Sequence, residues 1–369
     1  MSEALPLRRS ELPTPALIID RQALARNIAA MSEFARIRGI SLRPHAKTHK
    51  CAEIARRQLA AGATGIACAK LGEAEALAAE GIAELLVTSP IVSHQAITRL
   101  IDLNERSAGL TVVVDHPDNV SRLAAAAKTN PLRVLIDIDP GFHRTGVSSS
   151  AAAVDLARKV SECPALVYDG VQFYCGTDQH VNSLAERRER IDRKTAYLKT
   201  VLSALAAAGF EASTVSGGGT GSFAIDASLG VLTELQVGSY VFLDREYLDC
   251  EFDTLAPAFE PALSIDTRVV SANAPGQVTV DAGLKSMSTE AGPPRVIAGA
   301  DPASRYVFLG DEHGGLFTPP GAVDPGLDQV ITLLPPHCDP TVNLYDRFTV
   351  CEGGAVVDFW PVTARGRSE

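Results

Sequence analysis

Lys47 lies in a strongly basic segment, since His45, His49 and Lys50 stand within three positions of it. A lysine beside other cations loses its proton more readily, and the neutral amine can then form a Schiff base with an aldehyde. The segment therefore predicts a Schiff-base lysine. A solvated basic loop is the alternative interpretation.

A second segment, residues 216–222, has the sequence SGGGTGS. Glycines let backbone N–H groups approach an anion closely, and Thr220 can donate its hydroxyl. The segment matches neither a Walker A loop nor the dinucleotide-binding fingerprint, so a flexible turn is the alternative to a phosphate site. A phosphate site together with a Schiff-base lysine indicates pyridoxal phosphate (PLP), an aldehyde that carries a phosphate.

A third pair of residues, His337 and Asp339, is two positions apart near the C-terminal end of the sequence. In an extended segment, residues i and i+2 point to the same side, so the imidazole and the carboxylate could share one ligand. Such a pair suits Mn²⁺, Mg²⁺ or Zn²⁺, with waters completing the coordination. A hydrogen-bonded His–Asp pair without a metal is the alternative.

The chain that must position these residues alternates β-rich and helical segments from about residue 20 to residue 244. We predict eight strands, at residues 40–43, 65–69, 84–88, 110–114, 133–139, 166–174, 212–215 and 234–242. Several are continuous apolar runs, which are typical of parallel strands buried on both faces. Eight strand–helix units predict an α/β fold, a (β/α)₈ TIM-type barrel, with a doubly wound open sheet as the alternative. In a barrel, the glycine segment would follow the seventh strand, where phosphate is usually bound.

The pattern changes near Pro257. Beyond it, short alternating segments between Pro and Gly turns predict a second, smaller antiparallel β domain. We therefore predict a barrel over residues 1–255 and a β domain over residues 256–369, which contains the His337/Asp339 pair.

The composition excludes several classes of partner. A net charge of -10 argues against nucleic acid and anionic membranes, which call for clustered Lys and Arg. The first residues contain no apolar signal-peptide core, and no segment approaches the ~18 apolar residues of a membrane span. Scattered cysteines without a Cys-x-x-Cys pair are typical of a reducing compartment. We expect a cytoplasmic protein.

The segment RPHAKTHK at residues 43–50 resembles the PLP-lysine segment of the D-threonine aldolase and D-serine dehydratase family. These are fold-type III PLP enzymes with an alanine-racemase-like barrel. Further matches extend the resemblance over nearly the whole chain, at residues 141–146 (GFHRTG), 218–221 (GGTG), 234–240 (ELQVGSY), 281–285 (DAGLK), 311–314 (DEHG) and 337–341 (HCDPT). Ala69 and Cys175 depart from it, since some aldolases carry Gln and His there.

The resemblance implies a role for each matching residue. Lys47 would carry PLP as a Schiff base, and Arg144 would lie near the phenolic oxygen of the ring. Tyr174 and Tyr247 would line the cofactor. The phosphate would be held by Gly218, Gly219, Thr220, Gly221, Gly238 and Ser239.

The resemblance also implies a lyase that acts on a small-molecule D-β-hydroxy amino acid. An aldolase breaks the Cα–Cβ bond to give glycine and an aldehyde, and a metal held by His337 and Asp339 would lower the pKa of the β-hydroxyl. His180, after the sixth strand, is our candidate for the base, with a structural loop histidine as the alternative. Fold-type III relatives commonly dimerise, so we expect a homodimer.

A dehydratase that releases ammonia and a keto acid from D-serine or D-3-hydroxyaspartate is the alternative activity. Relatives that dehydrate D-serine typically hold Zn²⁺ with a His-x-Cys pair, whereas this chain has His337 and Asp339. A carboxylate favours Mn²⁺ or Mg²⁺ over Zn²⁺, so we predict an aldolase. A non-enzymatic PLP-binding protein is disfavoured, because such proteins are small and single-domain.

Overall fold

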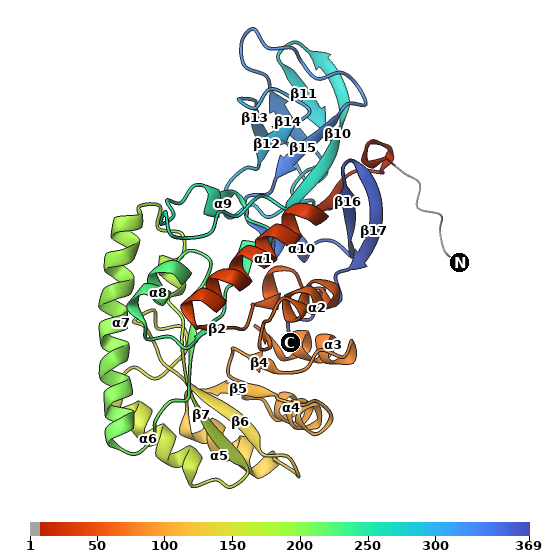
Figure 1. Ribbon diagram of the computed structural model, residues 1–369. Helices are drawn as coiled ribbons and strands as arrows, with labels where there is room; N and C mark the ends of the chain where they lie inside the picture. The colour runs from red at the N-terminus through yellow and green to blue at the C-terminus, as the bar shows by residue number, and fades with distance from the viewer. Residues whose placement is uncertain (1–7) are drawn as a thin grey trace.

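The structure, a computed structural model, describes residues 8–369 and contains two sheets (Figure 1). The lower part of Figure 1 is a parallel sheet with helices packed around it, and the upper part is a second sheet. None of the described helices combines the length and apolarity that crossing a membrane requires.

The parallel sheet has eight strands in the order β2-β9-β8-β7-β6-β5-β4-β3. The strands are β2 (Ser41–Leu42), β3 (Ile66–Cys68), β4 (Leu85–Val87), β5 (Thr111–Val114), β6 (Leu132–Asp137), β7 (Leu166–Phe173), β8 (Thr214–Gly217) and β9 (Glu234–Leu235). A parallel bridge between His45 and Ala67 joins the segment after β2 to β3, and so connects the two ends of this order. The predicted TIM-type barrel with a second β domain is therefore confirmed.

Helices alternate with these strands. They are α1 (Arg21–Arg38), α2 (Ala52–Ala60), α3 (Leu71–Ala79), α4 (His94–Arg106), α5 (Pro117–Ala126), α6 (Ser150–Ser161), α7 (Leu184–Ala207), α8 (Phe223–Leu229) and α9 (Arg245–Leu248), with the 3₁₀ turns η1 (Arg9–Glu11), η2 (Ala46–Thr48), η3 (Gly176–Asp178) and η4 (Ser239–Val241). Strand residues such as Val112 and Val114 are fully buried in the main core. Leu86, Val113 and Leu135 form a separate buried cluster on neighbouring strands, as expected when both faces of the sheet are covered.

The eighth barrel strand is shorter than the sequence predicts. Strand β9 ends at Leu235, and the predicted continuation to residue 242 instead turns into η4. The turn brings the Tyr240 N–H to the Thr220 hydroxyl at 3.0 Å. The backbone therefore leaves the strand in order to contact the glycine segment after β8.

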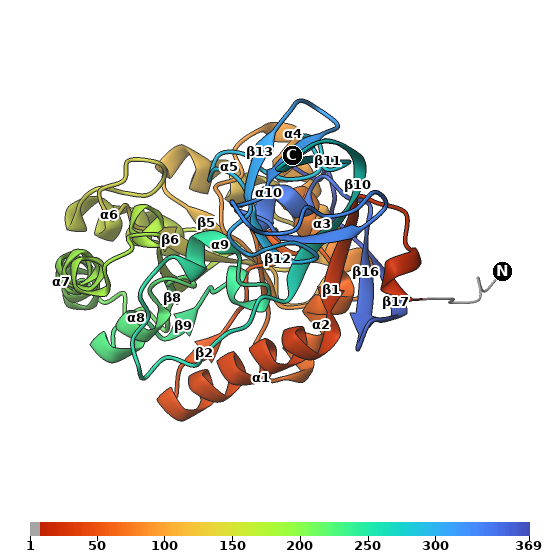
Figure 2. The same cartoon turned by 90° about the horizontal axis from the view of Figure 1, so that it is seen from above.

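The second sheet is almost entirely antiparallel. Its strands are β1 (Ala16–Asp20), β10 (Leu263–Ala274), β11 (Gln277–Val280), β12 (Arg295–Ala298), β13 (Arg305–Phe308), β14 (Gly314–Phe317), β15 (Val330–Leu334), β16 (Arg347–Glu352) and β17 (Ala355–Pro361), with the short helix α10 (Cys338–Val342) after β15. Strand β1 pairs antiparallel with β10 and parallel with β16 (Figure 2). Strand β1 therefore belongs to the second sheet and not to the barrel, although it precedes the barrel strands in the sequence.

Candidate active site

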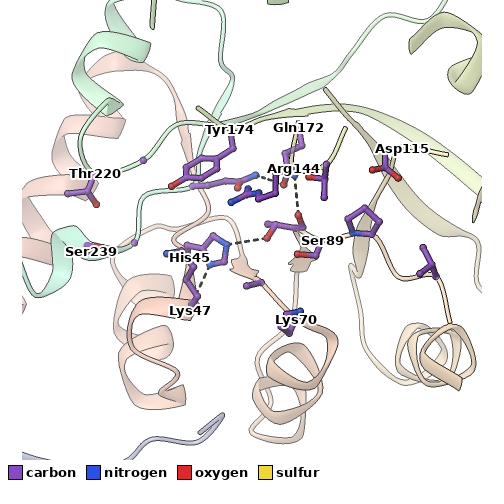
Figure 3. A pocket seen from close by; sticks show the side chains of 18 of the residues that line it. His45, Lys47, Lys70, Ser89, Asp115, Arg144, Gln172, Tyr174, Thr220 and Ser239 are labelled. Atoms are coloured by element: carbon purple, nitrogen blue, oxygen red, sulfur yellow. Dashed lines mark hydrogen bonds between the residues drawn. The ribbon is translucent and has the colours of Figure 1, made fainter. Parts of the chain in front are cut away.

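A cavity of about 560 Å³ opens at the carboxyl ends of the barrel strands (Figure 3). Most of the predicted cofactor residues line it: Lys47, Arg144, Tyr174, Gly219, Thr220, Gly238, Ser239 and Tyr247. They come from segments after β2, β6, β7, β8 and β9. The barrel therefore brings together side chains that are up to 200 positions apart in the sequence, from Lys47 to Tyr247. Gly218, Gly221, His180, His337 and Asp339 are not among the residues that line it.

Lys47 lies in η2 and donates from Nζ to Asp339 of the second domain. Burial is the largest single effect and lowers the pKa of Lys47, but the charges of Asp339 and Tyr174 and the hydrogen bond to Asp339 together outweigh it and raise the pKa above its ordinary value. The pKa of His45 falls to about 3 and that of His49 to about 4, chiefly because both rings are buried. The two histidines are therefore uncharged at neutral pH, and the expectation that they lower the pKa of Lys47 was wrong.

The glycine segment forms a cradle beside η4. A Cβ added at Gly219 would lie 2.5 Å from Gln179 Oε1, and one added at Gly238 would lie 2.6 Å from Thr48 Oγ1. Only glycine fits at these two positions without a shift of the neighbouring side chains. Gly221 has a different role, because its N–H donates a hydrogen bond to Gln179 Oε1 at 3.0 Å. The cradle fits an anionic group such as a phosphate.

Arg144 is positioned by a loop that Asp139 organises. Asp139 Oδ1 accepts the N–H groups of Gly141, Phe142 and His143 at 2.9, 2.8 and 3.0 Å. The guanidinium of Arg144 then lies 5.6 Å from the centre of the Tyr174 ring. We did not single out Asp139 from the sequence. Its position directly after a buried strand and before Pro-Gly was the available signal.

A chain of buried hydrogen bonds lies next to the cavity and was also missed. Arg43 donates to Glu234 at 2.9 Å, and Glu234 accepts from Ser216 at 2.6 Å. Gln236 Nε2 donates to Ser216 Oγ at 2.9 Å and to Gln172 Oε1 at 3.2 Å. The amide nitrogen of Gln236 is thus occupied by these two hydrogen bonds. Its carbonyl oxygen remains available to accept a hydrogen bond in the cavity that Gln236 lines.

His337 and Asp339 do not lie in an extended segment, so that prediction was wrong. His337 is the N-cap of α10 and Asp339 is in its first turn. Pro340, a residue favoured in the first turn of helices, was the overlooked signal. The two side chains still converge, with His337 Nε2 at 4.0 Å from Asp339 Oδ2. Within residues 8–369, no group of three or more His, Cys, Asp or Glu side chains is placed to hold a metal ion. Water would therefore supply the ligands beyond His337 and Asp339.

His180 lies between the cavity wall and the His337/Asp339 pair. Its ring centre is 4.4 Å from that of Tyr247 and 6.2 Å from that of His337. Burial lowers the pKa of His180, against the opposing effect of Glu246. Its Nε2 is buried and has no hydrogen-bond partner among the described residues. A neutral histidine with a free ring nitrogen is suited to accept a proton.

This barrel and its cavity define an alanine-racemase-like class of fold. Residues 19–246 match the family model described as "Alanine racemase, N-terminal domain", and residues 262–351 match "Putative serine dehydratase domain". Within this class, the chain belongs to the family that includes the D-threonine and 3-hydroxy-D-aspartate aldolases. The predicted family is confirmed, and PLP fits this family.

Three relatives carry this assignment. The chain is 40% identical to a D-threonine aldolase of Arthrobacter sp, over 98% of this chain and 95% of the relative. It is 38% identical to a 3-hydroxy-D-aspartate aldolase of Paracoccus denitrificans (strain Pd 1222), over 99% and 95%. The crystal structure of D-threonine aldolase from Filomicrobium marinum superposes with a TM-score of 0.96 and 37% identity, covering 100% of both chains.

Proposed function

We propose that this chain is a PLP- and divalent-metal-dependent aldolase that cleaves D-β-hydroxy amino acids to glycine and an aldehyde. The contact between Lys47 and Asp339 carries the proposal, because it joins the cavity lysine and the metal-type pair in one site. The similarity to two kinds of aldolase over nearly the whole chain supports it.

In this proposal the cavity residues hold the cofactor. The amine of Lys47 binds the cofactor aldehyde, and Gly219, Thr220, Gly238 and Ser239 hold its phosphate. Gly218 and Gly221 turn the backbone that forms the cradle. Arg144, Tyr174 and Tyr247 form walls of the cavity. Bound PLP supplies an electron sink that stabilises negative charge at Cα of the substrate.

The second part of the proposal concerns the metal. His337 and Asp339 hold a divalent ion, with Mn²⁺ or Mg²⁺ preferred because the site combines a carboxylate with waters. A divalent ion held there would supply Lewis-acid chemistry that lowers the pKa of a bound hydroxyl, and His180 would accept the proton that the substrate β-hydroxyl loses. Lys47 cannot bind an aldehyde and remain an ammonium ion paired with Asp339. Release of Asp339 by Lys47 would leave this carboxylate available to a metal ion.

Replacing Gly219 with alanine tests the cradle. The variant should bind PLP about ten- to hundredfold more weakly, because crowding of this kind costs about 1–3 kcal/mol and ~1.4 kcal/mol is a factor of ten. Absorbance titration of apoprotein with PLP measures the effect. Gly326→Ala is the control, since the nearest atom to its added Cβ is 4.0 Å away. Equal affinities of the two variants would remove Gly219 from the cofactor site.

Product analysis tests the reaction itself. With D-threonine, D-phenylserine or D-3-hydroxyaspartate, the protein should release glycine and an aldehyde, and the L-isomers should remain unchanged. The steric preference follows because Lys47 and the metal pair fix where the amine and the hydroxyl can lie. The match of residues 262–351 to a putative serine dehydratase domain favours a second candidate, the dehydratase. Ammonia and pyruvate from D-serine, with no glycine from the other substrates, would establish that activity instead.

The remaining assignments are also proposals. We infer a homodimer, supported by exposed apolar side chains on the second domain, namely Leu284, Leu309, Val323 and Leu327. Light scattering would give the mass in solution. All seven cysteines are free, which supports a reducing compartment such as the cytoplasm. We place the main boundary between the two domains near residue 256.

A further inference from the structure

We propose that Glu290 is a positioning residue that holds the His337 ring so that Nε2, and not Nδ1, binds the metal ion. This inference rests on the proposed function, since it needs the His337/Asp339 metal site. Glu290 lies in the loop between β11 and β12, and its carboxylate contacts the His337 side chain.

The hydrogen bond between the two side chains sets the orientation of the ring. His337 Nδ1 is 2.8 Å from Glu290 Oε1. An ionised carboxylate only accepts hydrogen bonds, so Nδ1 carries the proton and Nε2 keeps its lone pair. Nε2 is the nitrogen that lies 4.0 Å from Asp339 Oδ2. With metal–ligand bonds of about 2.1 Å, these two atoms are close enough to bind one ion.

The loop that carries Glu290 is fastened to α10 at two further points. The Ser288 hydroxyl donates to the backbone carbonyl of His337 at 3.1 Å. The Ser288 N–H donates to Thr341 Oγ1 at 3.0 Å, and Thr341 in turn donates to the His337 carbonyl at 2.7 Å. Ser288 and Thr341 are both buried. The Glu290–His337 contact is therefore held by a fixed loop, not by chance proximity of two surface side chains.

Glu246 is a second carboxylate near Nδ1 of this ring, and the distances separate its role from that of Glu290. Glu246 Oε2 is 3.8 Å from His337 Nδ1 and 3.9 Å from His180 Nε2. Both distances exceed those of a hydrogen bond. Glu246 therefore contributes negative charge between two histidines, whereas Glu290 fixes the proton position and the orientation of His337.

Manganese affinity tests the inference without depending on activity. Mn²⁺ is titrated calorimetrically into metal-free, PLP-loaded protein. Glu290→Ala should bind Mn²⁺ about tenfold more weakly, the lower end of the usual effect of such carboxylates, because Glu290 is itself half-exposed. Glu290→Gln keeps an acceptor oxygen and should recover part of the loss.

The controls separate positioning from misfolding and from failure of the proposed function. Glu312→Ala removes an exposed glutamate paired with Lys285 in the same domain and should bind Mn²⁺ as the unmodified protein does. The PLP absorption spectrum should be the same in every variant. Equal Mn²⁺ affinity of Glu290→Ala, Glu312→Ala and the unmodified protein would overturn the inference. Absence of Mn²⁺ binding by the unmodified protein would instead overturn the proposed metal site.

Discussion

Lys47→Ala should be colourless and should lose catalytic turnover by a factor on the order of a thousand or more, because no other amine replaces the covalent link to the cofactor. The unmodified protein should be yellow with PLP, and borohydride should fix the cofactor permanently to Lys47. Mass spectrometry of the reduced, digested protein identifies the modified residue. The covalent link also requires Lys47 to release Asp339, so its formation should slow as the pH falls.

Lys70→Ala is the matched control, because Lys70 lines the same cavity but is not in η2. It should keep the yellow colour and the borohydride reaction at Lys47. If the Lys47→Ala protein were still modified after reduction while Lys70→Ala was not, the assignment of the cofactor lysine would move to Lys70.

Asp339→Cys should lower aldol cleavage by more than about a hundredfold, which exceeds the 10- to 100-fold typical of groups that only support a metal ligand. A thiolate in place of the carboxylate should shift the metal preference from Mn²⁺ or Mg²⁺ towards Zn²⁺. PLP binding should change far less, since Asp339 does not line the cofactor cavity. Glycine release in the presence of each metal and the PLP absorbance measure the two effects separately.

Asp311→Cys, at an exposed carboxylate of the same domain, should leave both measurements unchanged. Chelation of the unmodified protein should abolish glycine release, and Mn²⁺ or Mg²⁺ should restore it. Full activity after chelation would contradict the metal site.

The barrel could be predicted because its strands correspond to local patterns in the sequence. A buried parallel strand such as Thr111–Val114 is a short apolar run bounded by polar turns. The sequence contains no such local signal for the sheet to which β1 belongs. Ala16–Asp20 is also apolar, but its partners are residues 263–266 and 349–351, and pairing over that distance depends on the whole fold.

The site was predictable in its residue types and not in its charges. The spacing of His337 and Asp339 indicated a shared ligand, although the segment is helical. The pairing of Lys47 with Asp339 spans 292 positions, so the neighbours of Lys47 in sequence gave the wrong direction for its pKa. Glu290 stands 47 positions from His337 in a loop rich in Gly and Pro, and only the fold brings the two together.

The position of β1 between β10 and β16 constrains the order in which the chain assembles during synthesis. Strand β1 leaves the ribosome long before residues 349–351, so its parallel pairing must wait until nearly all of the chain has been made. The barrel strands, from Ser41 to Leu235, are available earlier and can pair first. The cofactor cavity is thus formed by early segments and the metal pair by late ones. In a partly synthesised chain, Lys47 would be present before Asp339 exists to pair with its charge.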